Sequence, residues 1–341
     1  MLTKLILLTA LLPAADTLGL PERSAMLCSE PGPGIPPATW VVPINEEAAV
    51  AGPEPAWNAE CLARWLPEIR SALIIRPDSQ GVVRMFELMT TQRGEWLRVR
   101  PLVPRQTLNA PRVSGRTISI QGGRFVFSAE DDAGNRDVYV MHMRTNFLQR
   151  VTDFEGEDDG AVADASGAYF AFTSDHSGNG DIFHYTIGDP EATQLTTHPA
   201  RESHPMPVGD SIFFLREDPA GRQLVLRRRS LDWERIVDTG VAPQAPGRSA
   251  DGRFLCWAIE TDGDTEIRVL DTESGAPFLP VPSPAHEANC SWDPSHSGDL
   301  WFESDRTGDT EVFRWRSTDG SLENMSRHPG SDHLIGFAIR R

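Results

Sequence analysis

The sequence predicts an all-β protein: a six-bladed β-propeller of four-stranded antiparallel blades, with the ring closed by the C-terminal strand. Three observations lead to this prediction. Apolar residues alternate with the period of a β-strand, turns rich in Gly, Asn and Asp interrupt the alternation, and the pattern recurs along the 341 residues. The clearest copy spans 169–205, where an Asp-His-Ser-Gly-Asn-Gly turn separates two apolar strands. One such unit cannot bury its own faces, so its repetition decides the architecture.

The repeat is phased on the strand that follows each turn. Successive strand starts are 44, 42, 43 and 45 residues apart. The starts are Asp137, Asp181, Gln223, Glu266 and Glu311, and the apolar strands before them are 125–127, 170–172, 212–214, 254–256 and 300–302. Four strands of about six residues and four connections of about five fill this period. The period is therefore that of one propeller blade.

The ends of the repeat give the predicted blade count. A weaker unit over 73–99 precedes the five clear ones, which makes six. After the last unit, the strand 334–339 lies where another blade would begin. We expect this strand to become the innermost strand of the first blade, because a closed ring has no long open sheet edges. The propeller is placed at residues 72–341, since a seventh blade would have to come from the proline-rich residues before it.

Residues 1–15 have the features of a secretory signal peptide: one lysine, a short apolar run and small residues where a peptidase would cut. We therefore expect a periplasmic or secreted protein. No apolar run approaches the roughly 20 residues that span a bilayer, so no membrane span is expected. The formal net charge of −17 argues against a nucleic-acid partner, because binding to phosphates needs a basic face.

Residues 16–71 are predicted to form a proline-rich lead-in with a short strand at 39–42. Four larger residues within it lie four apart, which predicts a short helix over 56–70. They are Trp57, Cys61, Trp65 and Ile69.

The four cysteines permit two disulfides in an oxidising compartment, in any of three pairings. We favour Cys28–Cys61 and Cys256–Cys290, because the members of each pair are close in the sequence. No C-x-x-C spacing of a zinc site occurs.

The motifs of the repeat resemble those of a known family. Phe172-Thr-Ser-Asp175-x-x-Gly178-x-x-Asp181, followed by Gln194-Leu-Thr196-x-His-Pro199, is similar to the WD40-like (PD40) repeat of TolB-like propellers. The resemblance implies a propeller domain, and TolB itself is a periplasmic protein of the Tol–Pal envelope system. The same repeats occur in prolyl-oligopeptidase-like peptidases and in oligogalacturonide lyases. The sequence lacks the G-x-S-x-G motif of a serine hydrolase.

One acidic turn is a candidate metal site. Asp175, Ser177, Asn179 and Asp181 place oxygen atoms at alternate positions, as calcium loops do, which makes them a candidate site for weak Ca²⁺ binding. The alternative is that Gly and Asn form a tight turn and the acids cap backbone amides. We favour the structural interpretation, because almost every repeat carries such a turn, and we expect no other cofactor.

A second group of candidates lies near the starts of innermost strands, where a propeller's central channel opens. Glu202, His204, Asp332 and His333 are the candidate binding residues there. The predicted function is a non-enzymatic binding or scaffold protein whose partner is another envelope or secreted protein. The alternative is a secreted polysaccharide-degrading enzyme, similar to an oligogalacturonide lyase, with a metal held at the channel.

Overall fold

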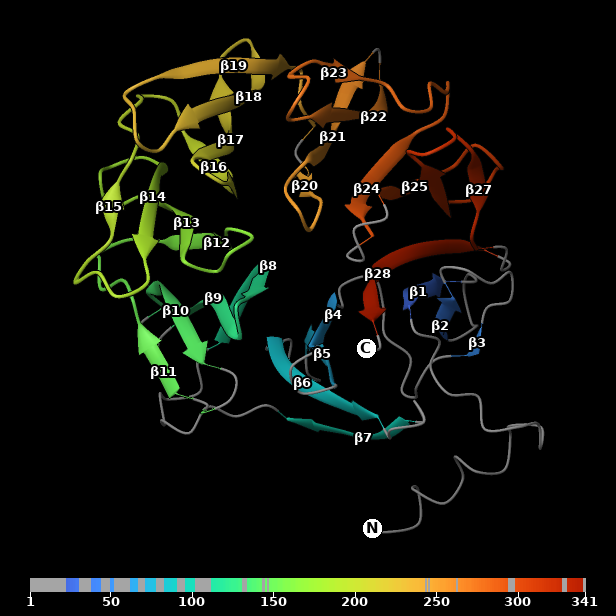
Figure 1. Cartoon of the computed structure of the whole chain (residues 1–341), viewed down its shortest axis with the longest axis horizontal. Coiled ribbons are helices and arrows are strands. Elements are labelled where there is room, and N and C mark those ends of the chain that lie inside the picture. Colours follow the sequence, from blue (N-terminus) through green and yellow to red (C-terminus); the bar gives the residue numbers. More distant parts are fainter. Residues whose placement is uncertain are drawn as a thin grey trace.

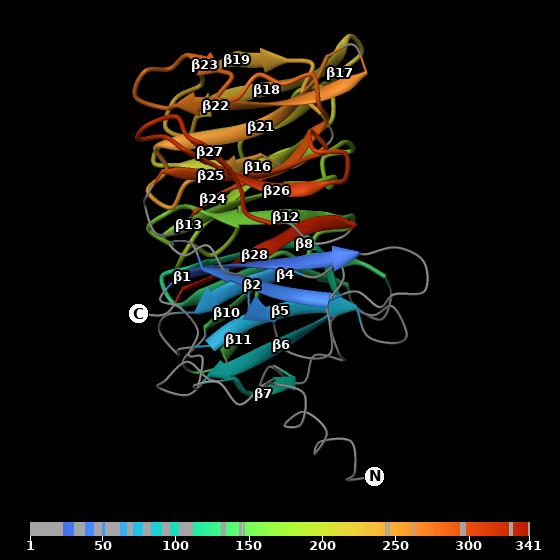
Figure 2. The ribbon, with the colours of Figure 1, turned by 90° about the vertical axis from the view of Figure 1, so that its right-hand side faces the viewer.

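The computed structural model describes residues 112–130, 134–142, 145, 147–242, 244, 246–261, 263–293, 298–326 and 330–339, and seven strands before residue 112. All regular elements among these residues are strands. The sheets are arranged around a common centre, with β8, β12, β16, β20, β24, β28 and β4 nearest to it (Figure 1). Seen from the side, the strands run across the thickness of this ring (Figure 2).

Five antiparallel sheets each contain four strands that follow one another in the chain. The first comprises β8 (Arg112–Gln121), β9 (Arg124–Glu130), β10 (Arg136–His142) and β11 (Phe147–Arg150). The second comprises β12 (Asp158–Ala163), β13 (Tyr169–Ser174), β14 (Asp181–Thr186) and β15 (Thr193–Gln194). The next comprises β16 (Glu202–Val208), β17 (Ser211–Asp218), β18 (Gly221–Arg228) and β19 (Glu234–Thr239). The fourth comprises β20 (Gly247–Arg248), β21 (Phe254–Thr261), β22 (Asp264–Asp271) and β23 (Pro277–Phe278). The fifth comprises β24 (Glu287–Trp292), β25 (Asp299–Ser304), β26 (Glu311–Arg316) and β27 (Leu322–Asn324). The strands expected from the repeat are confirmed in all five sheets.

A sixth sheet contains eight strands and joins the two ends of the chain. Its order is β3-β2-β1-β28-β4-β5-β6-β7. The strands are β1 (Arg23–Glu30), β2 (Ala38–Pro43), β3 (Val50–Ala51), β4 (Leu62–Leu66), β5 (Ser71–Pro77), β6 (Val83–Thr90), β7 (Trp96–Pro101) and β28 (Ser331–Ile339). β28 pairs antiparallel with β1 from Arg23↔Ile339 to Glu30↔Ser331. Its parallel contact with β4 is limited to Gly336↔Ala63 and Phe337↔Arg64.

This sheet does not confirm the predicted count of six blades. Strands β1 to β4 all lie before residue 72, yet they pair into the same sheet as β5 to β7 and β28. The strand expected at 39–42 is present as β2. The boundaries predicted for the signal peptide, the lead-in and the propeller remain predictions.

The helix predicted over 56–70 is wrong, because Leu62–Leu66 forms strand β4 and pairs antiparallel with β5. The reason lies in the spacing on which the prediction rested. A spacing of four is an even number, so positions four apart share one face of a strand as well as one face of a helix. Pro67 follows directly and is compatible with the end of either element.

The core lies between neighbouring sheets. Apolar side chains on the two faces of each sheet meet those of the sheets on either side, as strand alternation requires. Phe170 and Phe172 pack with Val126 and Val138 of the preceding sheet. Trp257 and Trp301 are the largest fully buried side chains. Each sheet therefore depends on its neighbours for the burial of its faces.

One hydrogen bond recurs between the start of the third strand and the residue two positions after the fourth strand. A Thr or Ser hydroxyl accepts a backbone N–H at the start of the third strand. The pairs are Val138 N to Thr152 Oγ1 at 2.9 Å, Ile182 N to Thr196 Oγ1 at 2.8 Å and Val312 N to Ser326 Oγ at 2.8 Å. The turns before these strands contain glycines at positive φ, such as Gly178 (107°) and Gly308 (112°), a conformation that L-residues rarely adopt.

Candidate functional site

Four innermost strands begin with a buried carboxylate or have one as their second residue. The four are Asp158, Glu202, Glu287 and Asp332, on β12, β16, β24 and β28. Glu202 and Asp332 each follow the histidine of a His-Pro corner by four residues, so the placement repeats in the sequence. The backbone N–H groups of Glu202 and Asp332 donate to equivalent carbonyls, those of Gly180 at 2.6 Å and Thr310 at 2.7 Å, each directly before the third strand of the preceding sheet. The acids at these inner strand starts therefore occupy equivalent positions at one end of the ring. A buried carboxylate must be paired or protonated to be stable, and these four differ in how they achieve this.

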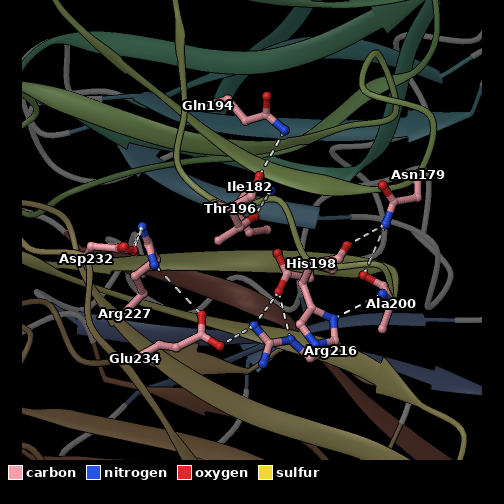
Figure 3. A network of polar contacts seen from close by, with 11 residues as sticks. Asn179, Ile182, Gln194, Thr196, His198, Ala200, Arg216, Arg227, Asp232 and Glu234 are labelled. Atoms are coloured by element: carbon pink, nitrogen blue, oxygen red, sulfur yellow. Dashed lines mark hydrogen bonds and ion pairs between the residues drawn. The ribbon is translucent and has the colours of Figure 1, made fainter.

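Glu202 is paired with Arg216 of β17. Figure 3 shows how Arg216 lies near Glu234, Arg227 and Asp232. Arg216 Nε donates to Glu202 Oε1 at 2.8 Å, and Nη2 lies 2.7 Å from the same oxygen. The Arg216 guanidinium also reaches Glu234 of β19 at 2.8 Å. The network continues to Arg227 and, at 3.1 Å, to the exposed Asp232. It thus crosses the whole sheet from its innermost to its outermost strand.

The third position of three innermost strands has a left-handed backbone. The φ angles are 70° at Gly160, 54° at His204 and 51° at Asn289. Each lies within a break in the pairing register with the second strand, which marks a β-bulge. A bulge re-aims the side chain at that position, so the imidazole of His204 and the amide of Asn289 occupy equivalent places in their sheets.

A second polar cluster joins β24, β25 and β28 through Glu303. Its Oε2 accepts from Asn289 Nδ2 at 2.8 Å and lies 3.0 Å from His333 Nδ1. Its Oε1 accepts the backbone N–H of Leu334 at 3.0 Å. A further hydrogen bond of 3.3 Å from Asn289 N–H to Gln244 Oε1 leads toward β20. Glu303 therefore holds three strands of two sheets together at this end of the ring.

Burial shifts the protonation of several of these groups. It raises the pKa of Asp158 to about 6 and that of Glu287 to about 7, although Arg306 beside Glu287 opposes the rise. The pKa of Glu202 is raised by burial as well, against hydrogen bonds that favour the charged form. The pKa of His204 is lowered because burial disfavours its cation. The ring end therefore contains carboxyls that titrate close to neutral pH.

No family model matches the sequence, and no curated protein matches it. Solved structures match it in fold. A TolB from Acinetobacter baumannii superposes with a TM-score of 0.55 at 16% identity, over 75% of this chain and 62% of that one. A putative TolB from Agrobacterium tumefaciens gives 0.53 at 13% identity, over 76% of this chain and 88% of that one.

The chain has a TolB-like propeller fold.

Propellers of two enzymes match as well. A puromycin-hydrolyzing peptidase from Mycobacterium tuberculosis has a TM-score of 0.65 at 13% identity, over 91% of this chain and 52% of that one. An oligogalacturonate lyase from Vibrio parahaemolyticus has a TM-score of 0.59 at 9% identity, over 85% of this chain and 90% of that one. The chain thus spans less than two thirds of the length of the Acinetobacter TolB and of the peptidase. At these identities the likeness establishes the fold alone.

The candidate binding residues of the sequence lie on two innermost strands of this TolB-like propeller. Glu202 and His204 belong to β16, and Asp332 and His333 to β28. Two sheets, β20–β23 and β24–β27, lie between these strands around the ring (Figure 1). Glu202 contacts Arg216, His204 Nδ1 lies 3.0 Å from Ser203 Oγ, and His333 contacts Glu303. The four candidate residues therefore lie at two separate places on the ring, and the side chains of Glu202, His204 and His333 contact different partners.

The sequence analysis missed several residues of these groups; Arg216 carried no signal, because only register sets it opposite Glu202, whereas Glu303 and Asn289 did carry one. Glu303 directly follows the apolar run Leu300-Trp-Phe302 within a strand, where an acidic residue was itself a signal of a buried polar contact. Asn289 follows Glu287 at the spacing with which His204 follows Glu202, so aligning the innermost strands would have found it.

The acidic turn between β13 and β14 uses its side chains internally. Asp175 Oδ1 accepts from the backbone N–H of Glu157 at 2.6 Å, and Asn179 Nδ2 donates to the carbonyl of His198 at 2.8 Å. Ser177 donates to Asp181, which also accepts from Gln194 Nε2 at 3.1 Å. In the described part of the chain, no three His, Cys, Asp or Glu side chains are grouped to hold a metal ion. Weak calcium binding here remains a prediction, which calorimetric titration of chelator-treated protein would test.

Two of the four cysteines meet across a boundary between sheets. Cys256 on β21 is fully buried, and burial followed by the neighbouring Cys290 side chain of β24 raises the pKa of its thiol. The structure holds both as free thiols, so the predicted Cys256–Cys290 disulfide is not formed in it. Gly247 packs closely here, since an added Cβ would lie 2.7 Å from Cys256 Sγ. The side chain of Cys28, and Cys61 altogether, lie outside the described residues.

Among the described residues, no helix is long and apolar enough to cross a membrane. The signal peptide predicted at residues 1–15 lies outside the described residues.

Proposed function

We propose that this chain is an exported, non-enzymatic propeller that binds another protein of the cell envelope. The observation that carries the proposal is that the polar side chains of Glu202 and Glu303, at the inner strand ends, are engaged in contacts within the protein. Glu202 is neutralised by Arg216, and Glu303 is occupied by Asn289, His333 and the Leu334 amide. Groups committed to such contacts hold strands together, whereas catalytic acids and bases must be presented to a substrate. The sequence of residues 1–15 and the TolB-like fold support the envelope location.

A lyase remains the second candidate because one matching structure is an oligogalacturonate lyase, of which this chain covers 90%. Such a function would need a metal and a basic group that converge on a polysaccharide. The histidines described at the inner ends, His204 and His333, lie on strands separated by two sheets. This separation favours the binding function.

One preparation can test both candidates. The exported protein is purified without chelators, and its metal content and its activity on oligogalacturonate are measured. In parallel, immobilised protein is cross-linked to an envelope extract and the captured proteins are identified. Specific capture of an envelope protein with no bound transition metal and no cleavage supports the proposal. Stoichiometric metal with cleavage of the oligosaccharide supports the lyase and overturns it.

We further infer that the ring has seven blades, closed by pairing between the chain ends. Only two residue pairs join β28 to β4 in the eight-stranded sheet. If the sheet is divided at this short contact, it gives two four-stranded blades, β3-β2-β1-β28 and β4-β5-β6-β7. Deleting residues 23–51 should then abolish cooperative unfolding, because β28 would lose its antiparallel partner. A deletion variant that unfolds cooperatively, with a melting temperature close to that of the full chain, would show that six blades close without these strands.

A further inference from the structure

Strand β19 stands apart from the other outermost strands whose side chains are described. It contains six residues, whereas β11 contains four, β27 three, and β15 and β23 two each. Short outer strands limit the free edge that a sheet offers to other chains. Within the described part of the chain, β19 is paired along one edge only, with β18. The other presents the backbone N–H and C=O groups of a full-length strand.

Exposed apolar side chains lie on β19 and in the turn directly before it. Leu231, Trp233 and Ile236 are 61%, 45% and 53% exposed. Arg228 N–H donates to the Trp233 carbonyl at 3.1 Å, and Ile236 lies opposite Val225, so Trp233 and Ile236 point to opposite faces of the sheet. A strand added beside β19 would therefore find an apolar contact on each face.

The charge around this edge is opposite to that of the protein. The stretch 227–235 contains four arginines and two acidic residues, in a chain of formal charge −17. Arg227 is engaged by Asp232 and Glu234. Arg228 and Arg235 are exposed, and no ion pair among the described residues involves either of them. The two unpaired cations lie on the same face as Trp233, because Arg235 is opposite Leu226 and Arg228 is opposite Trp233.

We propose that the free edge of β19 is a docking site for an extended, acidic segment of a partner protein. The segment adds a strand to the sheet, with its backbone bound to β19, the apolar residues of one face against Ile236, and the carboxylates of the other face beside Arg228 and Arg235. This inference rests on the proposed binding function and names the surface and the partner chemistry. A second copy of the chain fits less well, because antiparallel pairing of two β19 edges would bring the same arginines together.

The test uses synthetic peptides as probes. A fluorescent peptide of alternating Glu and Val, and a second with Lys in place of Glu, are titrated with the full chain in an anisotropy assay. The Glu peptide should bind at least roughly tenfold more tightly than the Lys peptide, and the difference should shrink at high salt. Hydrogen exchange should show that the Glu peptide protects amides within residues 230–239.

Variants locate the site. Arg228→Glu with Arg235→Glu should reverse the peptide preference, and Ile236→Ala should weaken binding of the Glu peptide about tenfold. Phe147→Ser, at an exposed aromatic residue of β11, is the matched control and should change nothing. All four positions are exposed, so thermal unfolding should confirm intact folds. Equal binding of the two peptides, or protection outside β19, overturns the proposal.

Two further results separate this inference from the proposed function. If the double arginine variant still captures the envelope partner, the β19 site is overturned and the binding function stands. If sedimentation shows a dimer that Ile236→Pro converts to monomers, the occupant is a second copy and the proposed partner is wrong. Loss of both the peptide and the envelope partner in the arginine variant, with the Phe147 variant unaffected, supports both proposals together.

Discussion

Arg216 and Glu202 form an ion pair that is almost completely withdrawn from water. Their side chains are 6% and 0% exposed, and the guanidinium lies 2.7 Å from the carboxylate. Taking two charges out of water is costly, and the cost is recovered only while both partners are present. The pair links the innermost strand β16 to β17, so its loss should weaken the contact between these two strands.

We therefore expect Arg216→Met to destabilise the protein by about 3–5 kcal/mol, because it leaves the Glu202 carboxylate buried without its cationic partner. Urea unfolding followed by tryptophan fluorescence measures the change. The double variant with Glu202→Gln should recover a large part of the loss, since neither charge is then buried.

The control for this prediction is Arg227→Gln in the same network. Arg227 contacts Asp232, whose side chain is 98% exposed, and an exposed pair contributes about 0–1 kcal/mol. If Arg216→Met costs no more than Arg227→Gln, burial does not govern this network.

Asp158 should make stability depend on pH. Burial raises the pKa of Asp158 to about 6, above its unfolded value of about 4. Between these values the folded state keeps a proton that the unfolded state has released. The free energy of unfolding therefore falls as the pH rises through this window.

Replacing Asp158 with Asn removes the ionisation. The variant should be more stable than the original protein at pH 8, by on the order of 2 kcal/mol, and the advantage should vanish below about pH 4. Thermal unfolding across this pH range measures it. Asp309→Asn, at an exposed acid, should show no such crossover. An Asp158→Asn variant that is uniformly less stable at every pH would mean that the carboxylate is held ionised by its neighbours.

The sequence predicts the middle of this fold better than its ends, for a physical reason. Between residues 124 and 326 each strand pairs with one nearby in the chain, so alternation and turns determine the pairing locally. The eight-stranded sheet is held by β28 against β1, whose residues are separated by almost the whole chain. No local pattern encodes that pairing, and the prolines between β1 and β2 made residues 16–71 look irregular.

In the candidate site, too, the features set by local sequence could be predicted and the contacts between distant residues could not. Glu202 and Asp332 could be placed at inner strand starts because they follow the phase of the repeat. Their partners could not, since Arg216 is one of many arginines in the sequence and only register sets it opposite Glu202. Likewise, Glu303 meets His333 across 30 residues of chain, through the packing of one sheet against the next.

The adjacency of Cys256 and Cys290 gives a redox prediction. Oxidised glutathione should accept two electrons from the two thiols, which release two protons as the S–S bond forms and leave two molecules of reduced glutathione. The new bond would close a loop of about 34 residues and stabilise the fold by roughly 3–4 kcal/mol in the chain-entropy estimate. Peptide mapping without reductant should find the peptides of Cys256 and Cys290 linked. Cys290→Ser should abolish the link and the gain in melting temperature, and a link from Cys256 to another cysteine would contradict the arrangement.

The left-handed backbone at His204 predicts that Gly and Val variants rank in opposite orders of stability at His204 and at His184. His204 has φ 54°, in the place that Gly160 occupies in its own sheet. An L-residue pays about 1–2 kcal/mol for this conformation and a β-branched one more, so His204→Gly should be more stable than His204→Val. His184 lies within strand β14 and has no positive φ. There the order should reverse, because a strand interior favours Val over Gly. Chemical unfolding of the four variants measures both orders, and the same order at both positions would show that the bulge at His204 relaxes when its side chain changes.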